Sequence, residues 1–176
     1  MGITYTELKK DDAEDLMRLR LSVLKTDPYS FSITEEEEKL ASKNNIESAI
    51  ESYRLSADRN MLGARNGSLV GVIGIERYEN ELEKHKVRLW GPYVDSSSRG
   101  KGIGDQLIEN ALEFAFSVSG VEIVTLETIS ESKSAISLFK KHGFKKTGVQ
   151  NQALCYGEKY ADLIYMQKIN QHNNGN

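Results

Sequence analysis

The clearest chemistry in the chain lies in Arg99–Gly104, a run of glycine and basic residues with the sequence Arg-Gly-Lys-Gly-Ile-Gly. It separates a stretch that alternates like a strand from an amphipathic helical pattern. Glycines let the backbone pass close to a ligand, and the first N–H groups of a helix are unpaired and partly positive. The segment therefore predicts a phosphate site, to which Arg99 and Lys101 add positive charge.

Other interpretations of this segment fit less well. A P-loop needs a glycine, four residues and then Gly-Lys followed by Ser or Thr, but Gly102 follows Lys101 and Asp95 stands at the first glycine position. A dinucleotide-binding fingerprint has the spacing Gly-x-Gly-x-x-Gly, whereas this chain has Gly-x-Gly-x-Gly. A turn without any ligand is the remaining alternative, although it would need neither three glycines nor two flanking cations.

Composition excludes several other kinds of site. The chain has 176 residues, a formal net charge of −3 and a single cysteine, Cys155. One cysteine cannot form an internal disulfide framework or a cysteine-based zinc site. The three histidines, His85, His142 and His172, are widely spread, so we expect no metal site. The mild acidity also argues against nucleic acid as a partner.

The sequence shows no signal for a membrane. No apolar run approaches the roughly 20 residues needed to cross a bilayer. The first residues lack the basic and apolar regions of a secretory signal. We therefore expect a cytoplasmic protein without a membrane partner, and we leave open whether it forms a homodimer.

Hydrophobic periodicity predicts the elements that position the glycine-rich segment. Strands are expected at Ile3–Leu8, Met61–Arg65, Leu69–Tyr78, Lys86–Val94, Glu122–Thr128, Phe144–Gly148 and Tyr160–Ile169. Helices are expected after Asp11, from Thr34, over Gly102–Val118 and over Ser132–His142. The order βααβββαβαββ indicates an α/β (α+β) fold with a mixed sheet, in one domain over residues 1–169. The polar tail, residues 170–176, is expected to be disordered.

Local signals place several boundaries. Thr34 and Glu37 have the spacing of a capping box, and Asn66-Gly67 is a strong hairpin signal. Gly143 stands where a C-cap glycine belongs. We expect the helix that starts at Thr34 to bury Leu40, Ile46 and Ile50, with a break at Asn44-Asn45.

The segment Arg99–Gly104 resembles the Arg/Gln-x-x-Gly-x-Gly/Ala motif of the GCN5-related N-acetyltransferases (GNAT). Tyr93-Val94-Asp95 looks like the end of that family's fourth strand, and Tyr160–Lys168 resembles its last strand. Further matches to the helix after the fifth strand and its Gly-Phe ending are Ala135, Leu138, Gly143 and Phe144. The resemblance covers nearly the whole chain, Ile3–Ile169, and implies a mostly antiparallel sheet flanked by helices.

The resemblance implies an acyltransferase that uses acetyl-CoA, bound where the fourth and fifth strands splay apart. Residues 99–104 would hold the pyrophosphate, and the main chain near Tyr93 and Val94 would pair with the pantetheine amides and polarise the thioester. A primary amine of a small molecule or protein would then attack directly in a ternary complex. The cofactor-binding residues implied are Tyr93, Val94, Arg99, Gly100, Lys101, Gly102, Ile103, Gly104, Ser132 and Phe139.

The acceptor amine must lose a proton before it attacks, because a lysine-like amine is mostly protonated at neutral pH. A general base is therefore expected. Glu76, His85 and Glu127 are alternative candidates, each of which could equally be a solvated strand residue. The acidic run Glu35–Glu38 is either the first turn of a helix or an attraction for a cationic amine. The sequence does not identify the acceptor.

Two positions depart from the family pattern. The family often has Asn and Tyr where this chain has Ser132 and Phe139, and that Tyr commonly protonates the leaving thiolate. Phe139 cannot do so, which leaves Tyr156, Tyr165 or water as the proton donor. An alternative function follows from this departure, namely a catalytically weak or inactive CoA-binding sensor or scaffold of the same fold.

Overall fold

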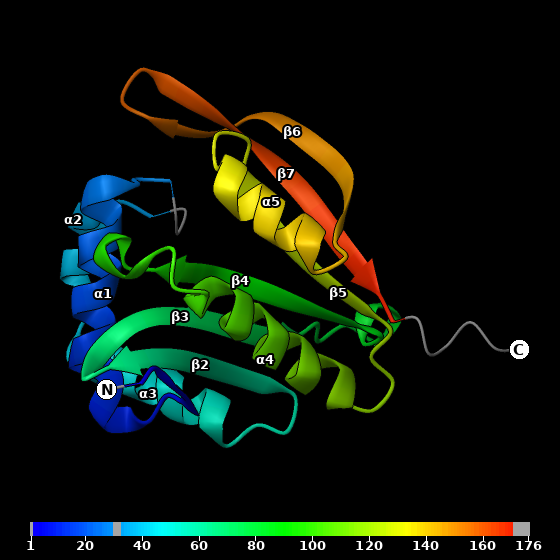
Figure 1. Ribbon diagram of the computed structural model, residues 1–176, viewed down its shortest axis with the longest axis horizontal. Coiled ribbons are helices and arrows are strands. Elements are labelled where there is room, and N and C mark those ends of the chain that lie inside the picture. Colours follow the sequence, from blue (N-terminus) through cyan, green and yellow to red (C-terminus); the bar gives the residue numbers. More distant parts are fainter. Residues whose placement is uncertain (1, 30–32, 171–176) are drawn as a thin grey trace, which may run out of the picture.

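The computed structural model describes residues 2–29 and 33–170 (Figure 1). Its strands are β1 (Thr4–Glu7), β2 (Arg59–Asn66), β3 (Ser68–Arg77), β4 (Lys86–Val94), β5 (Ile123–Ile129), β6 (Lys145–Tyr156) and β7 (Lys159–Ile169). Its helices are α1 (Ala13–Thr26), α2 (Glu35–Leu40), α3 (Lys43–Arg54), α4 (Ile103–Ser117) and α5 (Lys133–Lys141), with 3-10 turns at Lys10–Asp12, Glu81–Glu83 and Ser96–Ser98. Of the tail predicted over residues 170–176, all but Asn170 lie outside the described residues.

The seven strands form one sheet in the order β1-β2-β3-β4-β5-β7-β6. Every pair is antiparallel except β4–β5, so the predicted mixed, mostly antiparallel fold is confirmed. Helices α4 and α5 cover one face, and α1 to α3 cover the other face over β2 to β4 (Figure 1). Successive side chains of β3 point to opposite faces of the sheet, so the strand packs against both helical layers. Ile73 packs under α4, and Val72 packs against α1. Within the described residues, no helix is long and apolar enough to cross a membrane.

The sheet opens between its two parallel strands. Pairing of β4 with β5 covers Lys86–Arg88 and Ile123–Thr125, the first three residues of each strand. Farther along β4, a bulge against β3 falls at Gly91-Pro92, where Gly91 has φ of 57° and Pro92 has no N–H to donate. The bulge lies just beyond the last pair between β4 and β5, and a gap opens between the two strands from there.

The break between the second and third helices differs from the prediction. It falls at Ala41-Ser42 and not at Asn44-Asn45, because the Ser42 hydroxyl caps α3 by accepting from the Asn45 amide at 3.2 Å. Leu40 was expected in the core, but it ends α2 and is 85% exposed. Ile50 of α3 is buried as expected, so the buried apolar side chain belongs to α3 and not to α2.

The sixth strand is longer than predicted. The sequence indicated Phe144–Gly148, whereas β6 runs over Lys145–Tyr156. Its residues are mostly exposed, and its pairing with β7 is interrupted by irregularities at Lys146/Gly148 and Gln150/Leu154. An edge strand with bulges and little burial shows no regular alternation, so periodicity could not reveal it.

The acidic run at the start of α2 has two different roles. The capping box is confirmed, since the Glu37 carboxylate accepts from the Thr34 amide at 2.7 Å and the Thr34 hydroxyl accepts from the Glu37 amide at 3.1 Å. Glu38 is only 2% exposed and accepts two hydrogen bonds from Arg20 of α1, at 2.8 Å from Nε and 2.7 Å from Nη2. Its carboxylate therefore ties α2 to α1 and does not face an incoming amine.

Replacing Glu38 with alanine should destabilise the protein by about 3 kcal/mol, because the largely buried Arg20 would lose two hydrogen bonds to a carboxylate. Urea unfolding of the variant would measure the loss. Glu36→Ala is the matched control, since Glu36 lies two residues earlier on the same helix and is exposed. That control should change the free energy of unfolding by less than about 0.5 kcal/mol. Equal stability of the two variants would contradict the structural role of the pair.

Candidate active site

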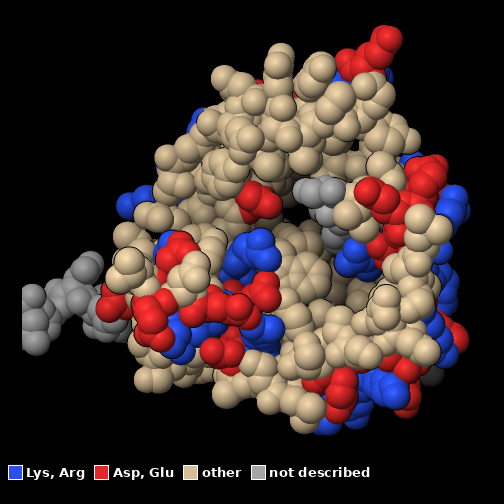
Figure 2. All heavy atoms as spheres, turned by 180° about the vertical axis from the view of Figure 1, so that it is seen from behind, with Lys and Arg blue, Asp and Glu red and all other residues tan. Residues whose placement is uncertain are grey.

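A cavity of about 760 Å³ opens between the splayed strands and is closed by α4 and α5. The face opposite to the view of Figure 1 shows this hollow, with Lys and Arg side chains on two sides of it (Figure 2). Ten of the predicted site residues line it, namely Tyr93, Val94, Arg99, Gly100, Gly102, Ile103, Gly104, Glu127, Ser132 and Phe139. Lys101, Glu76, His85 and Tyr156 do not belong to its wall.

The glycine-rich loop begins α4 at the cavity wall. Gly102 is the N-cap with φ of 75°, and Gly100 has φ of 76°, a left-handed conformation that favours glycine. The first bond of the helix runs from the Gln106 amide to the Gly102 carbonyl at 3.1 Å. The amides of Ile103 and Gly104 precede that bond, so they lie at the positive end of the helix and in the cavity wall. This arrangement suits an anion such as a phosphate.

Space around the two left-handed glycines fits a bound group. A Cβ atom at Gly100 or Gly102 would meet no protein atom within 4 Å. The backbone there is therefore open on the side where a side chain would stand, and it leaves room for a ligand.

The two basic residues of the loop lie differently. Arg99 donates from Nε to the Val94 carbonyl at 3.0 Å, and its guanidinium lies 5.2 Å from the centre of the Tyr93 ring. These contacts hold it at the wall. Lys101 is exposed, with Nζ 3.5 Å from the Ser97 carbonyl, so it adds charge at the rim of the cavity.

Beyond Arg88, β5 no longer pairs with β4, so the end of β4 presents a strand edge to the cavity, where the Val94 carbonyl accepts from Arg99. The Asp95 amide donates to the carbonyl of Val70 in β3 at 2.8 Å. Because successive residues of a strand point their amides to opposite edges, the Val94 amide faces the gap toward β5. An extended ligand with amide groups could pair with this edge as an added strand does.

Asp105 is an acidic residue in the first turn of α4, where it could compete with a bound anion. Its carboxylate forms an ion pair with Lys141 and lies 3.2 Å from Nε2 of His142, at the end of α5. The hydrogen bond from Lys141 is the main cause that lowers the pKa of Asp105. The carboxylate is thus neutralised by α5, and the positive end of α4 remains available.

Helix α5 forms the opposite wall. Phe139 is 2% exposed and meets Phe144 edge to face, with ring centres 6.1 Å apart. Gly143 follows the C-cap residue His142 with φ of 87°, which confirms the predicted helix-ending glycine. Gly104 allows α4 to approach α5 closely, because a Cβ there would lie 3.1 Å from Cδ2 of Leu138.

The three candidate bases lie in different surroundings. Glu127 on β5 is exposed and lines the cavity. Glu76 is bonded by Arg88 at 3.0 Å and is not in the wall. His85 precedes β4 at the closed end of the splay, where its carbonyl accepts from the Glu122 and Ile123 amides. The structure therefore brings only Glu127 of the three into the cavity. Within the described ranges, no group of three or more His, Cys, Asp or Glu is gathered as metal ligands would be.

The candidate acid lies at the rim. Tyr156 ends β6 and meets Tyr29 edge to face, with ring centres 6.3 Å apart. Tyr29 itself lines the cavity and donates its hydroxyl proton to the Lys159 carbonyl at 3.1 Å. Tyr165 donates to Oε1 of Gln150 at 2.7 Å. Neither Tyr156 nor Tyr165 lies in the cavity wall.

Comparison with known proteins supplies the family. Residues 17–144 match the family model described as the acetyltransferase (GNAT) family. The chain belongs to the GNAT family. It is therefore an N-acetyltransferase by family, which confirms the resemblance of its loop.

Individual relatives agree with this membership. RimI of Mycobacterium tuberculosis, an N-alpha-acetyltransferase, is 31% identical over 118 residues, which are 64% of this chain and 68% of RimI. YwnH of Bacillus subtilis is 30% identical over 84 residues, 48% of this chain, and the match spans only 51% of YwnH. A GNAT acetyltransferase of Streptococcus pneumoniae has a TM-score of 0.84 at 25% identity, over 96% of this chain and 99% of its own.

One further solved structure shows the same fold with a ligand. It is the GNAT superfamily phosphinothricin acetyltransferase of Sinorhizobium meliloti in complex with AcCoA. Its TM-score is 0.82 at 16% identity, over 96% of this chain and 89% of its own.

Several residues of this GNAT cavity escaped the sequence analysis. Arg20, Asp27, Arg88 and Trp90 line it, yet none belongs to a recognisable motif. The indole of Trp90 packs directly against Gly74 of β3. A Cβ atom at position 74 would lie only 2.0 Å from Cε2 of Trp90. Tyr53 of α3 meets the same indole edge to face at 5.9 Å, and burial raises the pKa of Tyr53 to about 12. A strand glycine opposite the single tryptophan was the only available signal.

Gly74→Ala should displace Trp90 from the wall of the GNAT cavity. We expect a loss of stability of about 1–3 kcal/mol from overpacking. A misplaced wall should also raise KM for the acceptor roughly 10-fold or more. Gly148→Ala on β6 is the control, since its nearest neighbour would be 3.9 Å away. If Gly74→Ala matched that control in both stability and KM, the position of the Trp90 indole would not depend on its contact with Gly74.

Proposed function

We propose that the protein transfers the acetyl group of acetyl-CoA to a primary amine by direct attack in a ternary complex. The observation that carries this proposal is the joint placement of two backbone features on one cavity. The amides of Ile103 and Gly104 lie at the positive end of α4, and the Val94 amide faces the gap beside them. One feature suits a pyrophosphate, and the other suits an extended arm with amide groups.

The chain's own residues fit acetyl-CoA along this path. Gly100, Gly102, Ile103 and Gly104 would hold the pyrophosphate through the backbone, with Arg99 beside them. Ser132 and Phe139 would line the other side of the arm. When bound, acetyl-CoA supplies an acetyl group already activated as a thioester. A further backbone amide of β4 near Val94 would donate to the carbonyl oxygen on which negative charge develops during attack.

Glu127 is the general base in this proposal. It is the one candidate of the three that lines the cavity and is exposed to it. Its carboxylate takes a proton from the ammonium form of the acceptor, directly or through a water molecule. Glu76 is engaged by Arg88, and His85 lies at the closed end of the strand pair.

Protonation of the leaving thiolate is assigned to water. Phe139 has no proton to give, and neither Tyr156 nor Tyr165 lies in the cavity wall. A thiol has a pKa near 8.5 in water, so its thiolate needs little help to leave near neutral pH. Phe139 also motivates the second candidate function, a CoA-binding sensor without turnover.

Release of free thiol from acetyl-CoA over a panel of amines tests the proposal. The panel contains amino acids, peptides with free N-termini, polyamines and aminoglycosides. RimI is named for N-alpha-acetylation and the Sinorhizobium meliloti protein for phosphinothricin, so α-amines come first. We expect thiol release that requires an acceptor. Binding of acetyl-CoA without release on any acceptor would favour the sensor instead.

A further inference from the structure

The cavity has a second end, on the sheet face opposite to α4. Val87 and Leu89 of β4 are buried in the core beneath α4. Arg88 and Trp90 alternate with them and therefore face the other way, toward the side of α1 and α3. On β5, Val124 and Leu126 are in the same core, so Glu127 faces the same side as Arg88. Arg88, Trp90 and Glu127 therefore line the part of the cavity that opens on the face away from α4.

Four charged residues line this end of the cavity: Arg20, Asp27, Arg88 and Glu127. The two arginines differ in how they are held. Arg20 donates two hydrogen bonds to a carboxylate that is itself buried, so its place is structural. Arg88 donates one hydrogen bond to Glu76, from Nη2 at 3.0 Å, and its side chain is 48% exposed.

Arg88 therefore keeps most of its capacity to bind an anion. A guanidinium has five N–H donors, and the bond to Glu76 uses one of them. Glu76 lies directly across the ladder from Arg88, which holds the guanidinium in place on the strand. A planar guanidinium that is fixed in this way suits a carboxylate, to which it can donate two parallel hydrogen bonds.

The distance along the strands fits a small ligand with two opposite charges. Arg88 pairs with Thr125 at the base of the splay, and Glu127 is two residues farther along β5. Two residues advance a strand by about 7 Å, and both long side chains can lean into the gap. A ligand between them would have its amine at Glu127 and its anion at Arg88.

We propose that Arg88 is a specificity-determining residue that binds a carboxylate carried next to the reacting amine, so that the preferred acceptors are free α-amino acids. The inference rests on the proposed function and on the role of Glu127 within it. A polyamine would bring a second cation where Arg88 offers hydrogen bonds to an anion. The N-terminus of a peptide has an amide where the carboxylate would be, and an amide gains less from a guanidinium.

The test compares amino acids with their own carboxamides as acceptors. A set of L-amino acids of different side chains, each paired with its amide, is assayed by thiol release at saturating acetyl-CoA. The wild-type protein should prefer the acid of its best pair by about 10- to 100-fold in kcat/KM. In Arg88→Ala this ratio should fall to near 1, mainly through KM for the acid, and Arg88→Lys should restore part of it.

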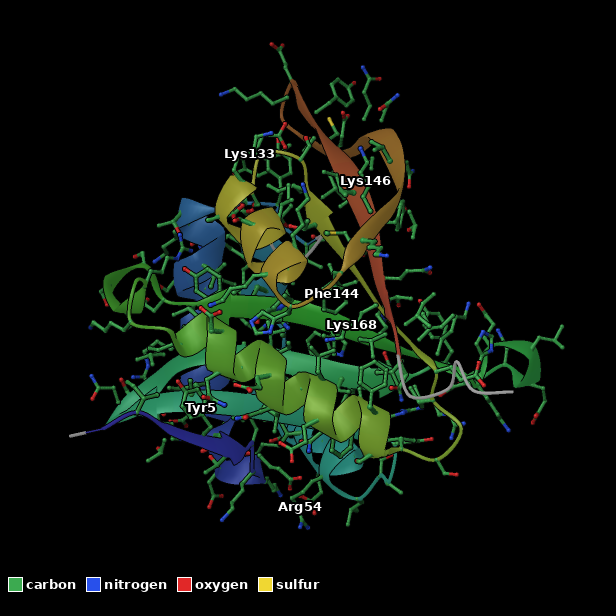
Figure 3. All side chains as sticks on the ribbon, turned by 45° about the vertical axis from the view of Figure 1, so that its right-hand side comes forward. Tyr5, Arg54, Lys133, Phe144, Lys146 and Lys168 are labelled. Carbon is green, nitrogen blue, oxygen red and sulfur yellow. The ribbon has the colours of Figure 1, made fainter. Side chains whose placement is uncertain are left out.

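Arg54→Ala is the matched arginine control. Arg54 ends α3, pairs with Glu51 and lies at the edge of the molecule (Figure 3), and it does not line the cavity. Its variant should keep the wild-type ratio. Stabilisation by acetyl-CoA in a thermal shift shows that each variant is folded and binds its donor.

The outcomes separate the inference from the function on which it rests. An amide used as well as its acid, an equal loss of both in Arg88→Ala, or a preference for amines without an anion would overturn the role of Arg88 alone. Acetyl-CoA binding without turnover of any amine would overturn the proposed function and the inference together.

Discussion

Gly102→Val should weaken the binding of acetyl-CoA by about 100-fold or more. Gly102 is the N-cap of α4 with φ of 75°, a conformation in which a β-branched residue costs roughly 1–3 kcal/mol. Relief of that strain should turn the amides of Ile103 and Gly104 away from the proposed pyrophosphate site, and the new side chain would occupy the open space beside Gly102. Wild-type protein at 100 times the dissociation constant should gain about 2.7 kcal/mol of stability from the ligand, and the variant should gain almost none.

Gly67→Val is the control that separates strain from the site. Gly67 has φ of 80° in the hairpin between β2 and β3, and a Cβ there would also meet nothing within 4 Å. Both variants therefore suffer the same kind of backbone strain, but only one lies at the cavity. Gly104 is less suitable for this test, because it packs against Leu138. Equal binding of acetyl-CoA by the two valine variants would contradict the pyrophosphate assignment.

Glu127→Gln should lower kcat by about 10²- to 10⁴-fold while acetyl-CoA binding stays intact. The amide of glutamine is similar in shape to the carboxylate but cannot take a proton from the acceptor. The deficit should shrink as the pH rises toward the pKa of the amine, because free amine then forms without a base. Initial rates at saturating acetyl-CoA across this pH range would measure the effect.

Variants of the other two candidates show whether the effect is specific. His85→Asn should stay within about 2-fold of wild type, since His85 lies at the closed end of the β4–β5 pair. Glu76→Gln should act mainly on KM, because Glu76 positions Arg88. A wild-type rate in Glu127→Gln, or an equally large loss in His85→Asn, would remove Glu127 as the base.

Features with short-range causes could be predicted from the sequence. The loop Arg99–Gly104, the capping box at Thr34 and the C-cap at Gly143 depend on residues a few positions apart, and all three are in the structure. The strands of the sheet follow from alternation wherever one face is buried. The edge strand β6 lacks such burial, which explains why its length was underestimated.

The acceptor end of the cavity could not be predicted, because it is assembled from distant parts of the chain. Glu38 looks like one of four equivalent acids until α1 places Arg20 against it. Trp90 and Gly74 become partners only through the register of β3 and β4. The sequence likewise did not distinguish Glu127 from Glu76 and His85 as the general base, since only the splay of β4 from β5 gives them different surroundings. Gly91-Pro92 within a predicted strand was a signal for that splay.

The mass of the acceptor after incubation with acetyl-CoA tests the central claim most directly. An α-amine should gain the mass of one acetyl group, free CoA should appear in equal amount, and the protein itself should stay unmodified throughout. Gly102→Val should form no product under the same conditions. An acetylated protein intermediate, or bound acetyl-CoA that never reaches any amine, would contradict direct transfer in this cavity.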